Sequence, residues 1–252
     1  MAGHSKWANV KHKKARVDAQ KGKAFTKIAR EIIVAAREGG ADISANFRLR
    51  LAVQKAREAN MPNDNVNRAI QKGAGEGEGS SLEQLTYEGY GQAGVAVLVD
   101  IMTDNRNRTA ADIRHIFSKR GGNMGEAGCV GWMFSRKGYL TIEKNEGLPS
   151  EDDLMMLALE SGAEDFKDED NVFVITTSPE DFERVKETFG QKKIEFSTAE
   201  ITMLPSTSVR IENPEEAAKV LRLLEALEDH DDVQNVYANF DIPDEIMQSL
   251  EG

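Results

Sequence analysis

The residues best suited to chemistry in this chain lie close to its N-terminus, in HSKWANVKHKKARVDAQKGKAFTK (residues 4–27). Cationic side chains dominate this stretch and flank one indole and two imidazoles: Lys6, Lys11, Lys13, Lys14, Arg16, Lys21 and Lys23, with Trp7, His4 and His12. Lysine and arginine attract phosphates without regard to base sequence, and an indole can stack on an unpaired base. The stretch therefore predicts a nucleic-acid-binding arm, in which Trp7 and His12 supply stacking or hydrogen bonds. The alternative is a solvated, disordered tail with Trp7 packed against the neighbouring helices.

The charge of the chain is divided unevenly along its length. The formal net charge is −11, yet residues 1–72 hold 16 basic and 6 acidic residues, a net of +10. The remaining residues hold 16 basic and 37 acidic side chains, a net of −21. Such asymmetry indicates a polyanion-binding end. Because the acidic remainder repels nucleic acid, we expect contact to be confined to one arm or face.

The arm is not accompanied by a device for reading base sequence. The chain holds no zinc finger, and no helix stands out with Asn, Gln or Arg aimed at base edges. We therefore expect contacts to the nucleic-acid backbone and shape more than to base edges.

A second candidate site is TDNRNRTAADIR (residues 103–114), where a predicted strand ends and a predicted helix begins. Free N–H groups at a helix N-terminus attract anions, and Arg106 with Arg108 could clamp a phosphate. We therefore predict a secondary anion contact at this pair. The alternative is ordinary capping of the helix by Asn105 or Asn107, with both arginines solvated.

Two further motifs resemble functional loops but favour structural roles. GGNMGEAGCVGWMF (residues 121–134) lacks the order of a phosphate-binding loop and joins a helix to a strand, so a cap, a turn and a hinge explain it better. EDHDD (residues 228–232) could attract a metal, but solvated acids are common at a helix end. His115 and His230 are far apart in the sequence, and no nucleophile–base spacing is recognisable. We therefore predict no enzymatic activity, no cofactor and no metal.

The cysteine content and the hydropathy predict a cytoplasmic protein. Cys129 is the only cysteine, which excludes an internal disulfide framework, suits a reducing compartment and favours a small buried side chain. No run approaches the about 18 apolar residues that span a bilayer, and the N-terminus lacks the apolar core of a secretory signal. We therefore expect no membrane contact. No strongly apolar exposed helix appears, which favours a monomer.

Three predicted helices adjoin the arm and must position its end. Residues 23–37 carry apolar side chains at helical spacing, and further helices are predicted over residues 44–59 and 63–72, so that the three form a small bundle. The polar side of the first helix prolongs the basic surface with four cations: Lys23, Lys27, Arg30 and Arg37. The stretch GAGEGEGSS (residues 73–81) is typical of a flexible linker.

The rest of the chain alternates strands with helices. A complete βαββαβ order, the ferredoxin-like signature, is predicted from strand 139–143, helix 150–160, strands 163–166 and 171–177, helix 179–189 and strand 194–203. Half-units flank it, with strands 94–104 and 128–134 around helix 106–120, and strands 208–211 and 233–240 around helix 214–228. We therefore predict an α+β fold in which one ferredoxin-like α/β domain is inserted in another. Its parts are a basic arm (1–22), a three-helix domain (23–75), a discontinuous α/β domain (82–134 and 206–252) and an inserted α/β domain (135–205).

Several stretches together resemble the YebC/PmpR family along nearly the whole chain: MAGHSKWANVKHKKARVDAQKGKAFTKIAREI, REANMPNDNVNRAIQKGAG, YEGYGQAGVAVLVDIMTDNRNRTAADIRHIFSKRGGNMGEAGCVGWMFSRKGYL and the acidic tail. This family includes the mitochondrial translational activator of cytochrome c oxidase. The resemblance implies a three-domain cytoplasmic protein with a helical N-terminal domain, two α/β domains and no known enzymatic activity. One departure is Asp42-Ile43, where many relatives have Asp-Pro, and it affects the start of the second helix.

The resemblance implies two classes of target. Some family members are labelled transcriptional regulators that bind DNA, and others resemble translation factors that act on the ribosome and relieve stalling at proline-rich stretches. Duplex DNA and ribosomal RNA present the same phosphates. A flexible arm with Trp7 favours irregular RNA, whereas many DNA-bending proteins also use basic arms.

We therefore predict a non-enzymatic nucleic-acid-binding regulator of gene expression. The first hypothesis is a DNA-binding transcriptional regulator. The second is a ribosome-associated translation factor that binds rRNA or tRNA. The third is a protein–protein adaptor whose α/β domains meet the partner while the arm only aids solubility.

Overall fold

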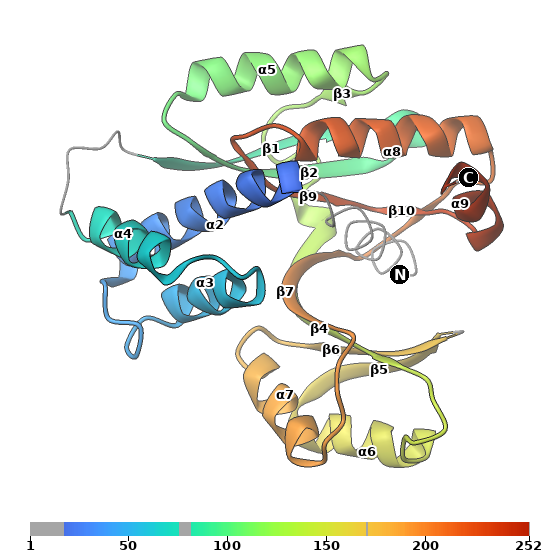
Figure 1. Ribbon diagram of the computed structural model, residues 1–252. Coiled ribbons are helices and arrows are strands. Elements are labelled where there is room, and N and C mark those ends of the chain that lie inside the picture. The colour runs from blue at the N-terminus through green and yellow to red at the C-terminus, as the bar shows by residue number, and fades with distance from the viewer. Residues whose placement is uncertain (1–17, 76–81, 170, 252) are drawn as a thin grey trace. The chain divides into compact units, whose positions relative to one another are not determined.

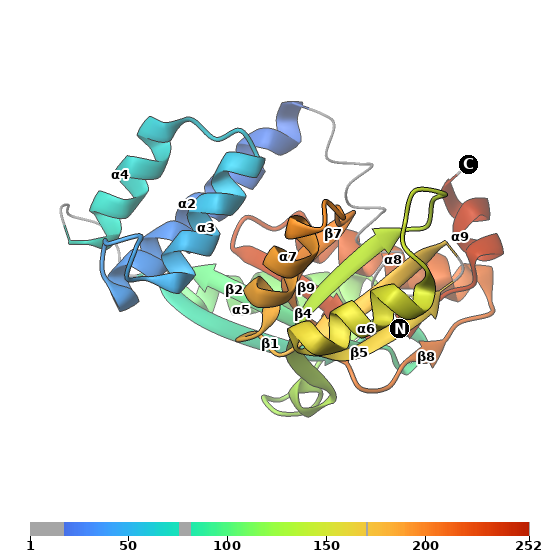
Figure 2. The same ribbon diagram turned by 90° about the horizontal axis from the view of Figure 1, so that it is seen from below.

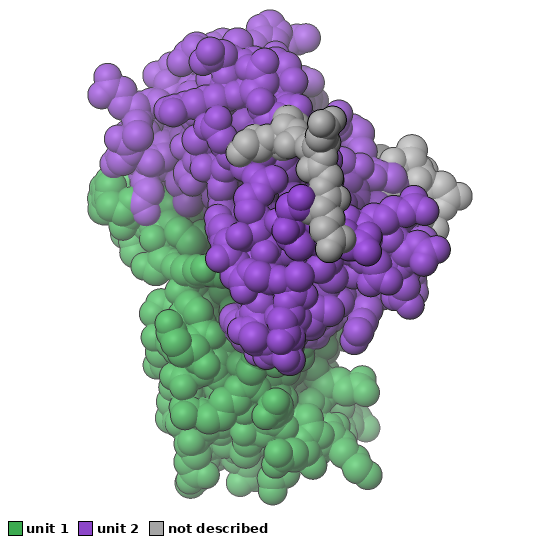
Figure 3. Space-filling model, turned by 90° about the vertical axis from the view of Figure 1, so that its left-hand side faces the viewer, with its two compact units in different colours: residues 1–2, 132–208 green, residues 3–131, 209–252 purple. Residues whose placement is uncertain are grey.

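Two compact units make up the part of the chain that the structure describes. The computed structural model describes residues 18–75, 82–169 and 171–251. The described residues of one unit are Trp132–Ser208, and those of the other lie within Gly3–Gly131 and Val209–Gly252 (Figure 3). Most of the predicted arm and of the predicted linker lies outside the described residues, and the four-part division into domains stays a prediction. No helix in the described ranges is long and apolar enough to cross a membrane.

Three helices form the N-terminal helical domain: α2 (Asp18–Gly39), α3 (Phe47–Glu58) and α4 (Asn63–Gly73) (Figures 1 and 2). Their apolar faces meet in one buried cluster, which confirms the predicted bundle. The helix predicted from Ser44 begins at Phe47, because Asn46 caps it. The side chain of Asn46 accepts the N–H of Leu49 at 3.0 Å and donates to the carbonyl of Ala35 at 2.8 Å, so one buried amide caps α3 and ties it to α2.

A four-stranded antiparallel sheet forms the core of the same unit, with the order β3-β1-β2-β9. Its strands are β1 (Glu83–Tyr90), β2 (Ala96–Thr103), β3 (Asn123–Met124) and β9 (Val233–Ala238). Helices α5 (Arg106–Lys119) and α8 (Pro214–Glu228) lie together on one face of the sheet (Figure 1). Their apolar side chains join those of β2 and β9 in one buried core, which links the two chain segments that flank the other unit.

This sheet has the ferredoxin-like strand order with one change of connection. Counted from β2, the strand after α5 is β3 and the strand after α8 is β9, as in a βαββαβ unit. The remaining central position is filled by β1, which precedes β2 in the chain and pairs with it along its whole length. The α+β fold is therefore confirmed, and β2 and β9, one from each predicted half-unit, lie side by side in one sheet.

The sequence pattern does not predict β1, and one strand that it predicts is not observed. The segment EQLTYEGY of β1 holds few apolar residues, and only Leu85 and Tyr87 pack on the core. The strand predicted over 128–134 is wrong: these residues form a loop, the short helix η2 (Gly131–Met133) and the first residue of β4. The strand predicted over 208–211 is observed as the two-residue β8 (Val209–Arg210), which pairs in parallel with β10 (Phe240–Asp241) rather than with the main sheet. Smaller elements that the pattern did not predict are η1 (Gln92–Gly94) and helix α9 (Asp244–Glu251).

The other unit is a complete ferredoxin-like βαββαβ fold, as predicted. Its elements are β4 (Phe134–Glu143), α6 (Glu151–Ser161), β5 (Ala163–Glu169), β6 (Val172–Thr177), α7 (Phe182–Gln191) and β7 (Thr198–Pro205). The strand order is β5-β6-β4-β7, and every neighbouring pair is antiparallel. Helices α6 and α7 cover one face of the sheet and share a buried core with it (Figure 1). Ser150 caps α6 by accepting the N–H of Asp153.

Candidate nucleic-acid interface and the cleft beside it

The predicted nucleic-acid interface is only partly covered by the described residues. Its arm lies outside them: Lys6, Trp7, Lys11, His12, Lys13, Lys14 and Arg16. Lys21 belongs to α2, but its side chain also lies outside the described part of the structure. The cations of the predicted interface that have described side chains are Lys23, Lys27, Arg30 and Arg37.

Three of these cations point toward the C-terminal end of α8. Lys23 Nζ donates to the carbonyl of Asp229 at 3.1 Å, and Lys27 Nζ donates to the carbonyl of Glu228 at 2.7 Å. Arg30 Nη1 donates to the carbonyl of Asp231 at 2.6 Å. The last carbonyls of a helix lack partners within the helix and carry partial negative charge, so cations stabilise this end. The spacing along α2 thus places three cations on one face, and in this structure that face binds residues 228–232.

Asp232 is the centre of a polar cluster, which we call the Asp232 cluster (Asp232, Arg30, Arg108, Thr103 and Thr109). The carboxylate accepts from Arg30 Nη1 and Arg108 Nη2 at 2.9 Å each. It also accepts from the hydroxyls of Thr109 at 2.7 Å and Thr103 at 3.1 Å. Burial by itself would raise the pKa of Asp232, but the bonds from Thr109 and Arg108 and the charge of Arg30 outweigh it and lower the pKa to about 2. The carboxylate is therefore ionised in the folded protein.

The Asp232 cluster corrects the interpretation of EDHDD as a run of solvated acids. The residue Asp232 is only 3% exposed, whereas Asp229 and Asp231 are exposed. His230 Nδ1 accepts the N–H of Asp232 at 3.1 Å, and His230 Nε2 faces Asp112 Oδ2 at 3.4 Å. Within the described residues, no group of three or more His, Cys, Asp or Glu side chains is placed to hold a metal ion.

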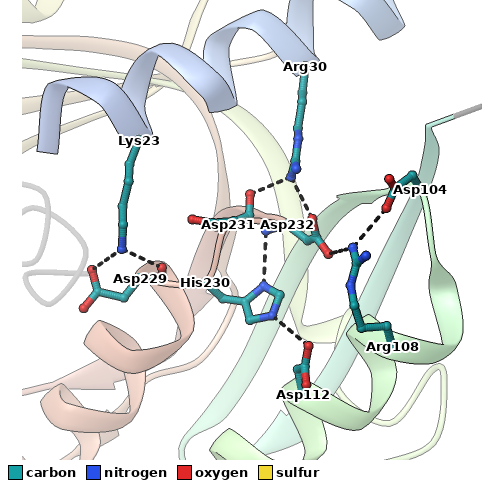
Figure 4. Close-up of a pocket in the computed structure, with 9 residues that line it drawn as sticks. All are labelled: Lys23, Arg30, Asp104, Arg108, Asp112, Asp229, His230, Asp231 and Asp232. Carbon is teal, nitrogen blue, oxygen red and sulfur yellow. Dashed lines mark hydrogen bonds and ion pairs between the residues drawn. The ribbon is translucent and has the colours of Figure 1, made fainter. Parts of the chain in front are cut away.

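An open cleft of about 610 Å³ lies between α2, the start of α5 and the loop after α8 (Figure 4). Charged and polar side chains line it: Lys23, Arg30, Asp104, Arg108, Asp112, Asp229, His230, Asp231 and Asp232. Figure 4 shows that its cations are directed at acceptors of the protein itself rather than into open space. The cleft therefore belongs to the contact between the helical domain and the sheet of the same unit.

The two arginines of the predicted secondary anion contact have different surroundings. Asn105 caps α5 by accepting the N–H of Arg108 at 3.1 Å, which is the capping alternative. Arg108 Nη2 donates to the carboxylates of Asp104 and Asp232, and the bond to Asp232 raises the pKa of the Arg108 guanidinium. Arg106 is exposed, and its carbonyl accepts from the Tyr87 hydroxyl at 3.3 Å. The capping prediction is therefore confirmed for Asn105, and Arg108 is exposed but also paired with Asp104 and Asp232.

The glycine-rich loop encloses a carboxylate of the protein itself. Glu88 accepts the N–H groups of Gly128, Val130 and Gly131 at 2.6 to 2.7 Å. Burial acts to raise the pKa of Glu88, but these three bonds lower it below its ordinary value. Cys129, in the same loop, is partly rather than fully buried, and burial together with Glu88 raises the pKa of its thiol. The loop is thus a turn built around Glu88, in agreement with the predicted structural role.

The helical domain also presents polar side chains that the sequence analysis did not select. Arg57 at the end of α3 and Arg68 and Lys72 on α4 are exposed. Their side chains form no hydrogen bond or ion pair with another described residue. Two signals in the sequence could have found them: the positive charge of residues 1–72, and the helical spacing, which leaves all three outside the buried stripes of α3 and α4.

Two family models match this chain and together span most of it. One, described as the N-terminal domain of the TACO1/YebC protein, matches residues 5–76, and another, described as its second and third domain, matches residues 82–240. A protein of Natranaerobius thermophilus named "probable transcriptional regulatory protein" is 60% identical over 99% of this chain and 100% of its own length. One of the same name from Halothermothrix orenii is 57% identical over 99% of both chains. A crystal structure of a conserved hypothetical protein from Aquifex aeolicus is 50% identical, with a TM-score of 0.80 over 93% of this chain and 96% of that one.

Proposed function

Since this chain belongs to the TACO1/YebC family, and its relatives are named as probable transcriptional regulatory proteins, we propose that it regulates gene expression by binding DNA. In this proposal it acts in the cytoplasm, as a monomer and without enzymatic activity.

One observation carries the proposal: positive charge is concentrated in one end of an acidic protein. Residues 1–72 have a net charge of +10, whereas the whole chain has −11. Phosphate binding is driven by cations and by the counterions that they release from the nucleic acid. Arg57, Arg68 and Lys72 add exposed cations on α3 and α4 of the same domain. A domain of this charge attracts a polyanion, while the acidic remainder of the chain repels the polyanion from the rest of the protein surface.

The proposed interface begins with the arm and continues along α2. Phosphates are bound by Lys6, Lys11, Lys13, Lys14, Arg16, Lys21, Lys23, Lys27, Arg30 and Arg37, while Trp7 and His12 stack or form hydrogen bonds. To contact phosphate, Lys23, Lys27 and Arg30 exchange their bonds to residues 228–232 for bonds to nucleic acid. Arg106 and Arg108 form the secondary anion contact, and Arg108 likewise has to leave Asp232.

The test is binding of the full-length protein to promoter-length duplex DNA and, in parallel, to ribosomes, across a series of salt concentrations. Replacement of Lys11, Lys13 and Lys14 by Ala should weaken DNA binding, and each lost phosphate contact should reduce the slope of log K against log salt by about 0.9. A matched control replaces Lys119, Lys192 and Lys219, which removes the same charge from exposed positions elsewhere. Absence of DNA binding, or equal effects of both triple variants, would refute the proposal.

The second candidate function is that of a ribosome-associated translation factor. Trp7 within the basic arm favours it, since unpaired bases for stacking are plentiful in ribosomal RNA and rare in duplex DNA. Ribosome binding that persists at physiological salt, together with DNA binding that fades and shows no sequence preference, would support this candidate over the first. Binding to neither polyanion would leave the adaptor hypothesis.

A further inference from the structure

Helix α4 turns one face to the core of the helical domain and the opposite face to solvent. Val66, Ala69 and Gly73 are buried, and Val66 and Ala69 belong to the apolar cluster of that domain. At about 100° per residue, the side opposite these three is centred on Gln71 and Asp64. We call this side the outer face of α4, and its exposed side chains are Asp64, Asn67, Arg68, Gln71 and Lys72.

The side chains of the outer face are free to meet a ligand. None of them forms a hydrogen bond or ion pair with another residue of the described ranges. By contrast, Lys23 and Arg30 on α2 already bind carbonyls and carboxylates of residues 228–232. Helix α4 also lies at the outer edge of the helical domain in both ribbon views (Figures 1 and 2).

The composition of the outer face differs from that of an ordinary solvated helix. Exposed helix faces are commonly built from Glu and Lys pairs, which favour the helical conformation. Here Asn67 occupies a helix interior, although Asn is a poor helix former, and it stands beside Arg68 and one turn from Gln71. Residues that lower the local helix propensity without packing or capping mark a functional surface.

We propose that the outer face of α4 reads base edges in the major groove of duplex DNA. The inference rests on the proposed DNA binding, and it names the element that would give that binding a sequence preference. It replaces the expectation from the sequence that contacts go mainly to the nucleic-acid backbone, because the structure shows which side of α4 is exposed. Arg68 pairs with guanine O6 and N7, and Asn67 and Gln71 pair with adenine N6 and N7, because these side chains match the donors and acceptors on those edges. Lys72, at the rim of the face, contacts a phosphate.

Two further features fit the groove better than a general phosphate-binding surface. An 11-residue helix is about 16 Å long and about 10 Å wide, so it enters a major groove of about 12 Å. Asp64 lies on the same face, where it would repel phosphates, yet a carboxylate can accept from the N4 amino group of cytosine. Asp64 also lies in the first turn of α4, where its charge stabilises the N-terminus of the helix.

The experiment selects preferred sites for the full-length protein from a pool of random-sequence duplexes and measures its affinity for a selected and a scrambled site. Arg68→Lys keeps the charge but loses the two-pronged geometry, and Asn67→Ala with Gln71→Ala leaves the charge unchanged. Each bidentate pair lost should lower the ratio of specific to non-specific affinity by about 5- to 150-fold, with the salt slope unchanged. Lys72→Ala should instead weaken binding to all sequences equally and reduce the salt slope by about 0.9.

A control variant with Gln191→Ala and Lys192→Ala changes exposed polar residues at the end of α7 and should keep the selected site and its affinity ratio. Thermal unfolding of each variant checks that the helical domain is intact. The proposal is overturned if the wild-type protein binds DNA but selects no sequence, or if the α4 variants keep the wild-type ratio. Both results leave DNA binding itself standing, whereas absence of any DNA binding refutes the proposed function as well.

Discussion

Asp232 lies in a run of acids, yet its surroundings differ from those of its neighbours. Two arginines and two threonines from separate elements donate to its carboxylate, while Asp231 and Asp229 remain exposed. A buried carboxylate is stable only with such donors, because burial without them favours the neutral acid. Conversely, Arg30 and Arg108 are held near each other by the charge between them. The Asp232 carboxylate therefore joins α2 to α5, beside the bond that Arg30 donates to the Met102 carbonyl of β2.

Replacement of Asp232 by Asn should destabilise the protein. The amide keeps the shape but loses the charge, and its NH₂ group cannot accept from Arg30, Arg108 or the threonine hydroxyls. Since hydrogen bonds to charged groups each contribute about 1.5–3 kcal/mol, we expect a loss of about 2 kcal/mol or more in the free energy of unfolding, measured by urea denaturation. Asp231→Asn, at an exposed carboxylate, should change it by less than about 0.5 kcal/mol. Equal effects of the two substitutions would contradict the assigned role of Asp232.

The same carboxylate should make stability depend on acid pH. The pKa of Asp232 is about 2 in the folded protein against an ordinary value of 3.8, so the folded state favours the ionised form. Its contribution is therefore complete above about pH 5 and is lost as the pH falls through 3.8 toward 2. Asp232→Asn lacks this dependence. The difference in urea midpoint between wild type and variant should narrow between pH 5 and about pH 3, and a constant difference would show that Asp232 does not titrate as described.

Two kinds of contact hold the helices of this protein in place: side chains that bind the end of a helix, and close packing of one helix on another. The C-terminal end of α8 has no basic residue in its last turn, and Lys23 and Lys27 from α2 supply the missing cations. At the other extreme of the helical domain, α4 ends against α2 so closely that only glycine fits. A Cβ on Gly73 would lie 2.5 Å from the carbonyl oxygen of Ile33 and 2.7 Å from the Cβ of Ala36.

Two glycine substitutions should therefore have opposite effects on the helical domain. Gly73→Ala forces α4 away from α2, and we expect a loss of about 1–3 kcal/mol in the free energy of unfolding. Gly22→Ala lies within α2 with nothing within 4 Å of the added Cβ, so it should stabilise the helix by up to about 1 kcal/mol. Circular dichroism during thermal unfolding measures both. A stabilising Gly73→Ala would mean that α4 packs on α2 less closely than described.

At the scale of the whole molecule, each unit has its own hydrophobic core. The core of 132–208 lies between its sheet and helices α6 and α7, and it uses no residue from the other unit. The helical domain and the sheet β3-β1-β2-β9 have separate cores within the other unit, and hydrogen bonds and ion pairs from α2 connect them. Charge is also divided unevenly along the chain: residues 1–72 have a net positive charge, and the remaining residues have a net negative charge.

A fragment of residues 132–208 should fold by itself. It holds all four strands and both helices of a ferredoxin-like fold, so its core is complete. We expect a cooperative thermal transition followed by circular dichroism. A shorter fragment, 132–196, lacks β7 and leaves one edge of β4 unpaired, and it should show no such transition. A non-cooperative melt of the longer fragment would contradict the independence of this unit.

The sequence by itself determined the family resemblance, the α+β class and most helices. Helices are set by local spacing and caps: Pro214–Glu228 is observed with its predicted bounds, and Ser150 caps α6. Strand β1 is not predicted from the sequence because only Leu85 and Tyr87 mark its core-facing side, and two residues are too few for a strand pattern. Pairing with β2 over the whole strand stabilises it instead. The strand predicted over 128–134 is instead a loop because its N–H groups bind Glu88, an acceptor that lies 40 residues or more away in the chain.

Charge and composition also predicted a basic, nucleic-acid-binding end, which stays a prediction. Only the tertiary structure decided which cations of the described residues bind the protein itself. Lys23, Lys27 and Arg30 share one face of α2 by helical geometry, but residues 228–232 reach them only when β9 pairs with β2 and brings the end of α8 to that face. The outer face of α4 is free because Val66, Ala69 and Gly73 are needed for packing on the other side. Local spacing fixes which residues share a helix face, and long-range pairing determines what each face meets.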